Sequence, residues 1–201
     1  MSGLAPLITV VPVGTILYRV VRTHRGIAGA LHFGPTAGSP PASRFDSLTG
    51  AYRVCYLAES RAGAFAESLL RLATPLDAAS GIRLVAMRAL DERSWMRTTT
   101  RRALDVADVC GPGLARLGGT GALSMGSDHV AARELSEQLH AWEPELDGIR
   151  FRLRYDPDET GIALFDRAAP SLRTVTAITA LTSDFRGLGA LLDRYGVGVD
   201  S

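Results

Sequence analysis

Hydrophobic and polar residues alternate along the chain in two different patterns. Runs rich in β-branched and aromatic residues favour strands, and they occupy residues 16–21, 52–58, 82–87, 149–153, 161–165 and 172–180, with a shorter extended piece at 104–106. Apolar residues spaced three and four apart favour helices, and they occur over residues 61–72 and 129–142 and in a last segment that ends near Tyr195. Because strands and helices follow one another without a regular period, the pattern predicts one α+β domain.

The predicted helices begin at residues that commonly cap helices. Ser60 precedes the first helix, Ser127 and Asp128 precede the second, and Thr182 or Ser183 precedes the last. Side-chain oxygens at these positions accept hydrogen bonds from free backbone amides. The buried stripe of the second helix is expected to consist of Ala131, Leu135, Leu139 and Trp142. The apolar stripe of the last helix packs either on the protein's own core, which is the more common case, or on a partner.

Two segments rich in glycine interrupt this pattern. The first, residues 26–50, is long enough to line a site. The second, residues 111–126, is similar to a dinucleotide-binding loop, but Arg116 occupies the place of the third glycine, which favours a plain flexible loop. Residues 1–14 lack the basic start of a signal peptide and cannot span a membrane. We expect them to form a loose lead-in to a domain that occupies residues 15–201.

The composition mainly excludes certain kinds of chemistry and of binding. The 201 residues are 46% hydrophobic and 21% charged, as in an ordinary globular protein. All 22 basic residues are arginine, and the absence of lysine excludes Schiff-base chemistry and a phosphate-loop lysine. A net charge of +1 without a basic cluster argues against nucleic-acid binding. Four scattered histidines predict no metal site, and Cys55 and Cys110 are expected to be buried free thiols of a cytoplasmic protein.

Four polar residues stand out because their neighbours are apolar: Arg19, Arg44, Tyr56 and Glu67. Most of them also have an ordinary structural explanation. Glu67 can pair with Arg71 one helical turn later, Arg19 can extend its charged end to water from an edge strand, and Tyr56 can be a core tyrosine with a satisfied hydroxyl. Each residue alone is therefore weak evidence of function.

Taken together, these residues belong to a series of short motifs that closely resembles the RES domain family. The motifs are Leu17-Tyr18-Arg19-Val20, Phe33-Gly34-Pro35, Ser43-Arg44-Phe45-Asp46, Tyr56-Leu57-Ala58-Glu59-Ser60, Ala64-Phe65-Ala66-Glu67, Asp147-Gly148-Ile149-Arg150-Phe151 and Ala163-Leu164-Phe165-Asp166. The resemblance implies a split β-sheet core with flanking helices, as in ADP-ribosyltransferases. It also implies a toxin that depletes NAD+ and is held inactive by an antitoxin of the Xre type.

The resemblance further implies where NAD+, the expected substrate, binds. On the family pattern, Arg19, Arg44, Tyr56 and Glu67 fall in the NAD+ pocket. Guanidinium groups suit the pyrophosphate because they form bidentate, charge-assisted bonds, and Tyr56 is placed to stack on or hydrogen-bond the nicotinamide side. Glu67 suits the positive charge that develops on the ribose. We therefore predict Glu67, Arg19 and Tyr56 as catalytic residues.

One position departs from the family pattern. The family's serine falls on Leu153, beside Arg154, and a leucine neither donates nor accepts a hydrogen bond. Ser127, at the entrance of the second helix, or Ser124, in the glycine-rich segment, is a candidate replacement, because amides at a helix entrance favour anions. We include Ser127 among the predicted NAD+-binding residues, with Arg19, Arg44 and Tyr56.

Three functions follow from the resemblance and from this departure. The first is cleavage of NAD+ at the nicotinamide–ribose bond, by hydrolysis or by phosphorolysis. The second is transfer of ADP-ribose to a protein from the same pocket. The third is a catalytically weakened module that binds a nucleotide or an antitoxin. A homo-oligomer is compatible with the sequence, which fixes neither the acceptor nor the antitoxin.

Overall fold

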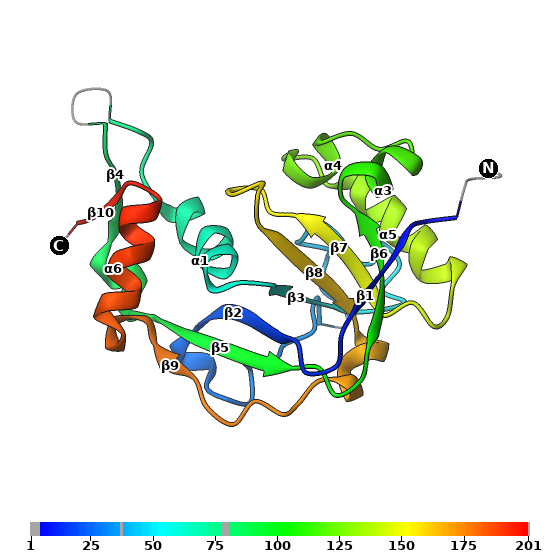
Figure 1. The fold of residues 1–201 in the computed structure, drawn as a ribbon, viewed down its shortest axis with the longest axis horizontal. Helices are drawn as coiled ribbons and strands as arrows, with labels where there is room; N and C mark the ends of the chain where they lie inside the picture. The colour runs from blue at the N-terminus through cyan, green and yellow to red at the C-terminus, as the bar shows by residue number, and fades with distance from the viewer. Residues whose placement is uncertain (1–4, 37, 78–80, 201) are drawn as a thin grey trace.

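The computed structural model describes residues 5–36, 38–77 and 81–200. Eight strands form one large sheet in the order β1-β6-β7-β8-β3-β2-β5-β9 (Figure 1). They are β1 (Ile8–Val11), β2 (Ile16–Arg22), β3 (Val54–Ala58), β5 (Arg93–Thr99), β6 (Leu104–Val109), β7 (Gly148–Arg152), β8 (Thr160–Phe165) and β9 (Thr179–Ala180). A small parallel sheet pairs β4 (Arg83–Ala86) with β10 (Val197–Asp200).

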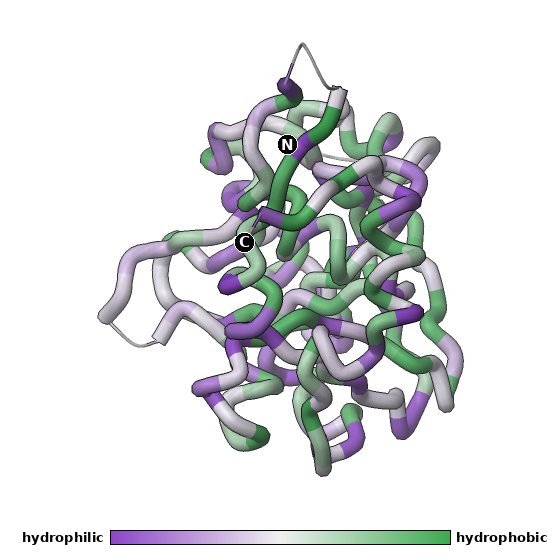
Figure 2. The backbone as a smooth tube through the Cα atoms, turned by 90° about the vertical axis from the view of Figure 1, so that its left-hand side faces the viewer, coloured by the Kyte–Doolittle hydropathy of each residue, from purple (hydrophilic) through white to green (hydrophobic). Residues whose placement is uncertain are grey.

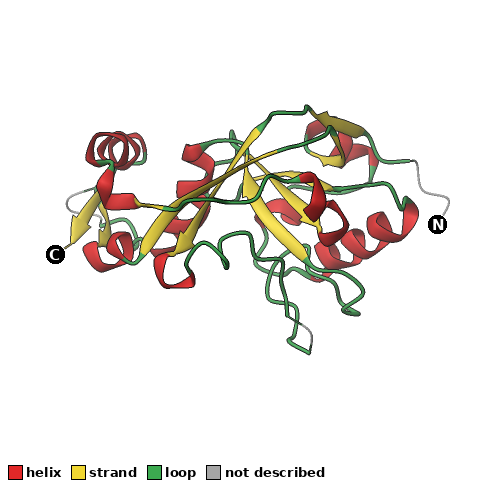
Figure 3. Cartoon of the chain, turned by 90° about the horizontal axis from the view of Figure 1, so that it is seen from below, coloured by secondary structure: helices red, strands yellow, loops and turns green. Residues whose placement is uncertain are grey.

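Helices lie at both ends of the molecule, and the strands cross between them (Figure 3). They are α1 (Arg61–Leu69), α2 (Met87–Asp91), α3 (Gly111–Arg116), α4 (Ala122–Met125), α5 (Val130–Trp142) and α6 (Phe185–Arg194). Short 3-10 turns complete the chain: η1 (Thr23–Arg25), η2 (Leu70–Leu72), η3 (Asp166–Ser171) and η4 (Leu181–Ser183). Within the described ranges, none of the helices has the length and apolar character needed to traverse a bilayer.

The large sheet is split between β2 and β3. These two strands pair only at Tyr18 and Ala58, whereas β2 pairs with β5 over its full length and β3 does so with β8. The side chain of Arg19 reaches across the resulting gap, where its Nη1 donates to the carbonyl oxygen of His32 and to Sγ of Cys55. The prediction of an α+β domain with a split sheet and flanking helices is confirmed.

Each face of the sheet has its own apolar core. On one face, α1, α5 and α6 bury Phe65, Leu139 and Leu188. On the other, side chains such as Leu17 and Leu164 are covered by the loop over residues 26–50 and by the segment after η3. Hydrophobic and hydrophilic segments alternate along the whole trace (Figure 2), because strands and helices each present one face to a core and the other to water. Because Leu188 of α6 is buried in the first of these cores, the last helix packs on the protein's own core.

Some predicted elements differ from those observed. The segment expected as a loose lead-in contains β1, which pairs with β6 at the edge of the sheet. The strand expected at 172–180 is reduced to β9, because the residues before it cover the sheet rather than join it. Strand β5 was not predicted from the sequence. The other predicted strands are present with shifts of a few residues at their ends.

The helix starts were predicted less well than the helices themselves. Ser60 caps α1 as expected, because its Oγ accepts from the amide of Gly63 at 2.9 Å. Of the two residues predicted to cap α5, Ser127 does not do so, whereas Oδ1 of Asp128 accepts from the amide of Val130, the first residue of the helix. Asp184 caps α6 in place of Thr182 or Ser183, through the amide of Gly187.

The buried stripe of α5 is also rotated from the predicted one. It consists of Ala132, Ser136 and Leu139, and Trp142 is 49% exposed. A serine can be buried here because its hydroxyl accepts from Tyr52 Oη at 2.7 Å and donates to the Phe45 carbonyl at 2.9 Å.

Candidate functional site

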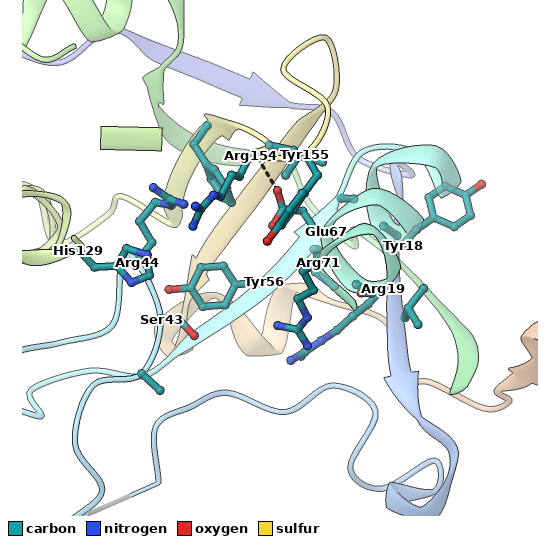
Figure 4. A pocket seen from close by; sticks show the side chains of 18 residues that line it. Tyr18, Arg19, Ser43, Arg44, Tyr56, Glu67, Arg71, His129, Arg154 and Tyr155 are labelled. Carbon is teal, nitrogen blue, oxygen red and sulfur yellow. Dashed lines mark hydrogen bonds between the residues drawn. The ribbon is translucent and has the colours of Figure 1, made fainter. Parts of the chain in front are cut away.

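A cavity of about 360 Å³ opens where β2 and β3 diverge. Residues 18–20 of β2 and 56–58 of β3 line one side of it. The remaining lining residues come from the loop before β3, from α1 and η2, from the entrance of α5 and from the end of β7: Ala42, Ser43, Arg44, Ala64, Glu67, Ser68, Arg71, His129, Phe151, Leu153, Arg154 and Tyr155. The structure thus brings Arg19, Arg44, Tyr56 and Glu67 into one cavity (Figure 4).

Glu67 lies half-buried on α1 and is the carboxylate of this cavity. Its Oε1 accepts a 2.5 Å hydrogen bond from the main-chain amide of Arg154, just beyond β7. In the described part of the chain it forms no ion pair, so the alternative pairing with Arg71 is not observed. One carboxylate oxygen is therefore fixed by the backbone, and no arginine of the described ranges lies within ion-pair distance of the carboxylate.

Two main-chain carbonyl groups hold the side chain of Arg44. Its side chain is 9% exposed, and Nη1 donates to the carbonyl oxygens of Leu123 (2.8 Å) and Gly126 (3.4 Å) at the end of α4. Burial lowers the pKa of the Arg44 guanidinium, and the carboxylate of Glu67 opposes this effect. An arginine keeps its charge under these conditions, so its other N–H groups remain donors for an anion.

Arg19 enters the cavity from the opposite face of the sheet. It points to the same face as Leu17 and Val21, which belong to the core on that face. Its bonds to His32 and Cys55 hold it in the gap between β2 and β3. The strand is interior rather than at an edge, so the edge-strand explanation of Arg19 is wrong. In Figure 4, Arg19 lies on one side of Tyr56 and Arg44 on the other.

Tyr56 holds the loop that carries Arg44. Its hydroxyl accepts from the amide of Phe45 at 2.8 Å and donates to Oδ1 of Asp46 at 3.0 Å. The other oxygen of Asp46 accepts from the amides of Ala42 and Ser43. Burial, followed by the charge of Asp46, raises the pKa of Tyr56 well above its usual value, so the hydroxyl stays protonated. Because the hydroxyl proton is already donated to Asp46, the ring is the part of Tyr56 that is available to a ligand in the cavity.

Ser127 does not join these four residues. It is exposed and lines a separate cavity of about 580 Å³ between the glycine-rich segment and α5. The other candidate replacement, Ser124, belongs to α4, and its side chain lies outside the part of the structure that is described.

Leu153 has a packing role in the wall of the cavity. Its side chain is 2% exposed and lies against two glycines, Gly63 of α1 and Gly161 of β8. A Cβ at either glycine would come within 2.7 Å and 2.6 Å, respectively, of a Leu153 methyl carbon. The leucine therefore fills space that the two glycines leave between α1 and the sheet.

Three basic residues that line the cavity were not predicted as site residues: Arg71, Arg154 and His129. Among the described residues, no side chain forms a hydrogen bond or ion pair with the guanidinium of Arg71 or Arg154, although Arg154 lies over the ring of Tyr155. Burial, followed by the charge of Arg44, lowers the pKa of His129, which favours a neutral imidazole at pH 7. Two of them had a signal in the sequence: Arg71 follows Glu67 by one helical turn, and Arg154 stands beside the position of the family's serine.

Four guanidinium groups and one carboxylate thus line the cavity. This arrangement suits a ligand with several negative charges and one centre that becomes positive. In the described residues, no cluster of three histidine, cysteine or acidic side chains is arranged to hold a metal ion.

The chain is similar to proteins of one family. The RES domain sequence model matches residues 16–186. Among solved structures, a chain from the crystal structure of the M. tuberculosis MbcT-MbcA toxin-antitoxin complex shares the fold, with a TM-score of 0.64 and 19% sequence identity over 90% of this chain and 92% of the other. No curated protein matches the chain by sequence.

Proposed function

The chain belongs to the RES domain family, and from that premise we propose that it is the toxin of a toxin–antitoxin pair and that it cleaves NAD+ at the nicotinamide–ribose bond. The observation that carries this proposal is the charge arrangement of the cavity. Four arginines and Glu67 line it, and in the part of the chain that the structure describes none of these five side chains forms an ion pair. NAD+ presents two pyrophosphate charges and a ribose carbon that becomes cationic, which is the complement of this arrangement.

The arginines would bind the substrate. Arg44 is buried and already fixed on one edge by main-chain carbonyls, so binding an anion costs little side-chain entropy. Its free edge, together with Arg19 across the cavity, would hold the pyrophosphate oxygens by charge-assisted bonds. The ring of Tyr56 between them would pack against the nicotinamide end.

Glu67 would act on the reacting carbon. When the bond between C1′ of the ribose and the nicotinamide nitrogen breaks, both electrons go to the nitrogen, so nicotinamide leaves neutral and needs no general acid. The positive charge left on the ribose is stabilised by the Glu67 carboxylate, which the Arg154 amide keeps in place. A water oxygen that bonds to C1′ releases one proton and gives ADP-ribose, and a phosphate oxygen gives ADP-ribose 1′-phosphate.

The partner is proposed to be an antitoxin of the Xre type. The structural neighbour comes from a complex of a toxin with its antitoxin, which supports an antitoxin as the partner of a chain of the same fold, and the Xre type is proposed from the family resemblance alone. Such a partner is expected to reduce the activity of the purified protein.

A catalytically weakened binding module is the alternative that the structure favours next. Leu153 occupies the wall of the cavity without any polar atom in its side chain, and Ser127 lies elsewhere. This alternative predicts that NAD+ binds and stays intact.

One assay separates these functions. Purified full-length protein is incubated with NAD+, with and without inorganic phosphate and with a protein extract, and the products are separated by chromatography. Free nicotinamide with ADP-ribose or its phosphate supports the proposal. A labelled extract protein supports ADP-ribosyl transfer, and bound but intact NAD+ supports the binding module. Either of the last two results would overturn NAD+ degradation as the function.

A further inference from the structure

The amide that fixes Glu67 belongs to the loop between β7 and β8. In this loop the Leu153 amide donates to the Glu159 carbonyl at 3.1 Å, and the Glu159 amide donates to the Asp156 carbonyl at 3.0 Å. The position of the Arg154 amide, and so of the Glu67 carboxylate, depends on the shape of this loop.

The end of α6 holds this loop from outside the cavity. Tyr195 Oη donates to Oδ2 of Asp156 at 2.8 Å, and Arg194 Nη2 donates to the same oxygen at 3.2 Å and to Oε1 of Glu159 at 2.9 Å. The side chains of Asp156 and Glu159 are 12% and 17% exposed, whereas the side chain of Arg194 is 48% exposed. The two carboxylates are therefore largely shielded from water, although the guanidinium that pairs with them is not. We refer to these contacts of Arg194 and Tyr195 with Asp156 and Glu159 as the loop clamp.

The same residues also reach the helix that carries Glu67. Oε2 of Glu159 accepts from Ser60 Oγ, which caps the start of α1. The Tyr195 ring stacks on Phe65 of α1, with 5.9 Å between ring centroids and 9° between planes. The clamp is therefore connected both to the helix that presents the carboxylate and to the amide that orients it.

We propose that Arg194 and Tyr195 are positioning residues for Glu67, acting through Asp156 and Glu159. The proposal rests on the proposed function, because it assigns these residues to the reaction in which Glu67 takes part. Neither residue lines the cavity, so they fix the geometry of the carboxylate without touching the substrate. Misplacement of a reacting group by a fraction of an ångström is enough to slow catalysis.

The test uses the full chain with Arg194→Gln and Tyr195→Phe. Each variant is expected to lower kcat for NAD+ cleavage about tenfold and to change KM less than about twofold, because the clamp makes no contact with Arg19 or Arg44. Arg194→Lys keeps a charged donor and is expected to recover most of the lost kcat.

The matched control is Arg61→Gln. Arg61 pairs with Asp184 at 2.8 Å and so joins the same two helices, α1 and α6, away from the loop. This variant is expected to lower the melting temperature as much as Arg194→Gln does, with kcat unchanged. An equal loss of kcat in both variants would mean that Arg194 acts only on stability, and the proposal would be wrong.

A second readout does not depend on catalysis. Hydrogen exchange of the Arg154 amide, followed by NMR, is expected to become faster in Arg194→Gln and Tyr195→Phe and to stay slow in Arg61→Gln. If the wild-type protein leaves NAD+ intact, the proposed function fails, and this exchange rate alone decides whether the clamp holds the amide. Unchanged exchange in the two clamp variants would refute the clamp even in an active enzyme.

Discussion

Two glutamates close in the sequence have opposite surroundings in the fold. Glu59 directly follows β3 and points to the face of the sheet that the loops cover, where it meets Arg150 and Thr160. Glu67 lies on the next helix and points into the cavity on the other side. The same residue type thus occurs once in a saturated ion pair and once with its charge unpaired.

Both carboxylate oxygens of Glu59 already accept hydrogen bonds from side chains of the protein. Arg150 donates from Nε and Nη2 to the two carboxylate oxygens at 2.8 Å and 3.2 Å, and Thr160 donates as well. Burial would raise the pKa of Glu59, but these bonds outweigh it and the pKa lies below its usual value. Charges that satisfy each other in this way serve the fold.

The charged side chains that line the cavity form no ion pairs with one another within the described residues. Arg44 and Arg19 donate to main-chain carbonyls and a thiol, and Glu67 accepts from a main-chain amide. Unpaired charges reduce stability, so a fold that retains them supplies groups for a ligand. The partners of a charged side chain, more than its burial, therefore separate a structural residue from a functional one.

The largest expected effect comes from removing the charge of each glutamate in turn. Glu67→Gln keeps the size of the side chain and an oxygen for the Arg154 amide, and it is expected to slow NAD+ cleavage about 100- to 1,000-fold with little change in melting temperature. Glu59→Gln leaves Arg150 with only the more distant carboxylate of Asp108, at 3.7 Å, and is expected to cost about 1–3 kcal/mol of stability with kcat unchanged. Nicotinamide release and thermal unfolding measure the two effects, and a reversed outcome would contradict the comparison.

Much of the fold follows from the sequence where local signals agree. The strand that carries Arg19 and the helix capped by Ser60 were predicted because their apolar spacing and end residues point the same way. The sequence gives no such signal for β5, in which Ser94 and Thr98 are polar but buried. Their hydroxyls are satisfied by Thr23 and by the Arg173 carbonyl, which come from distant parts of the chain. Tertiary partners of this kind cannot be read from a strand's own residues.

The candidate site, like the fold, could be predicted from the sequence only in part. Arg19, Arg44, Tyr56 and Glu67 stand out by residue type, and they share a cavity. Contacts made by the backbone have no sequence signal, and the amide of residue 154 and the carbonyls that hold Arg44 are of this kind. The role of the Tyr56 hydroxyl also depends on Asp46, whose position is set by the fold of the loop.

A smaller effect is expected from Arg44→Lys. Lysine keeps the charge, but it loses the planar fork that bonds the α4 carbonyls with one edge and faces the cavity with the other. We expect the Kd for NAD+ to rise about 10- to 30-fold, or about 1.4–2 kcal/mol. Calorimetric titration measures it with Arg44→Lys placed in the Glu67→Gln protein, which cleaves the ligand far more slowly than wild type.

The matched control for this substitution is Arg53→Lys, made in the same Glu67→Gln background. Arg53 is 57% exposed and pairs with Asp166, and it does not line the cavity. Its replacement should leave the Kd for NAD+ unchanged. Equal affinity in the Arg44→Lys protein and this control would remove Arg44 from the binding site and leave it a purely structural arginine.

The smallest effect is the pH dependence of the Glu59 pair. Because the folded-state pKa of Glu59 lies below its usual value of 4.5, the stability that the pair adds is fully present above that pH. It is lost as the pH falls through the lower, folded-state pKa, since protonation removes the charge that Arg150 requires. The difference in unfolding free energy between wild type and Glu59→Gln should therefore be constant from pH 7 to about pH 5 and shrink below pH 4.5. Chemical denaturation over this range measures it, and a difference that grows as the pH falls would mean that the carboxylate is destabilised, not stabilised, by its partners.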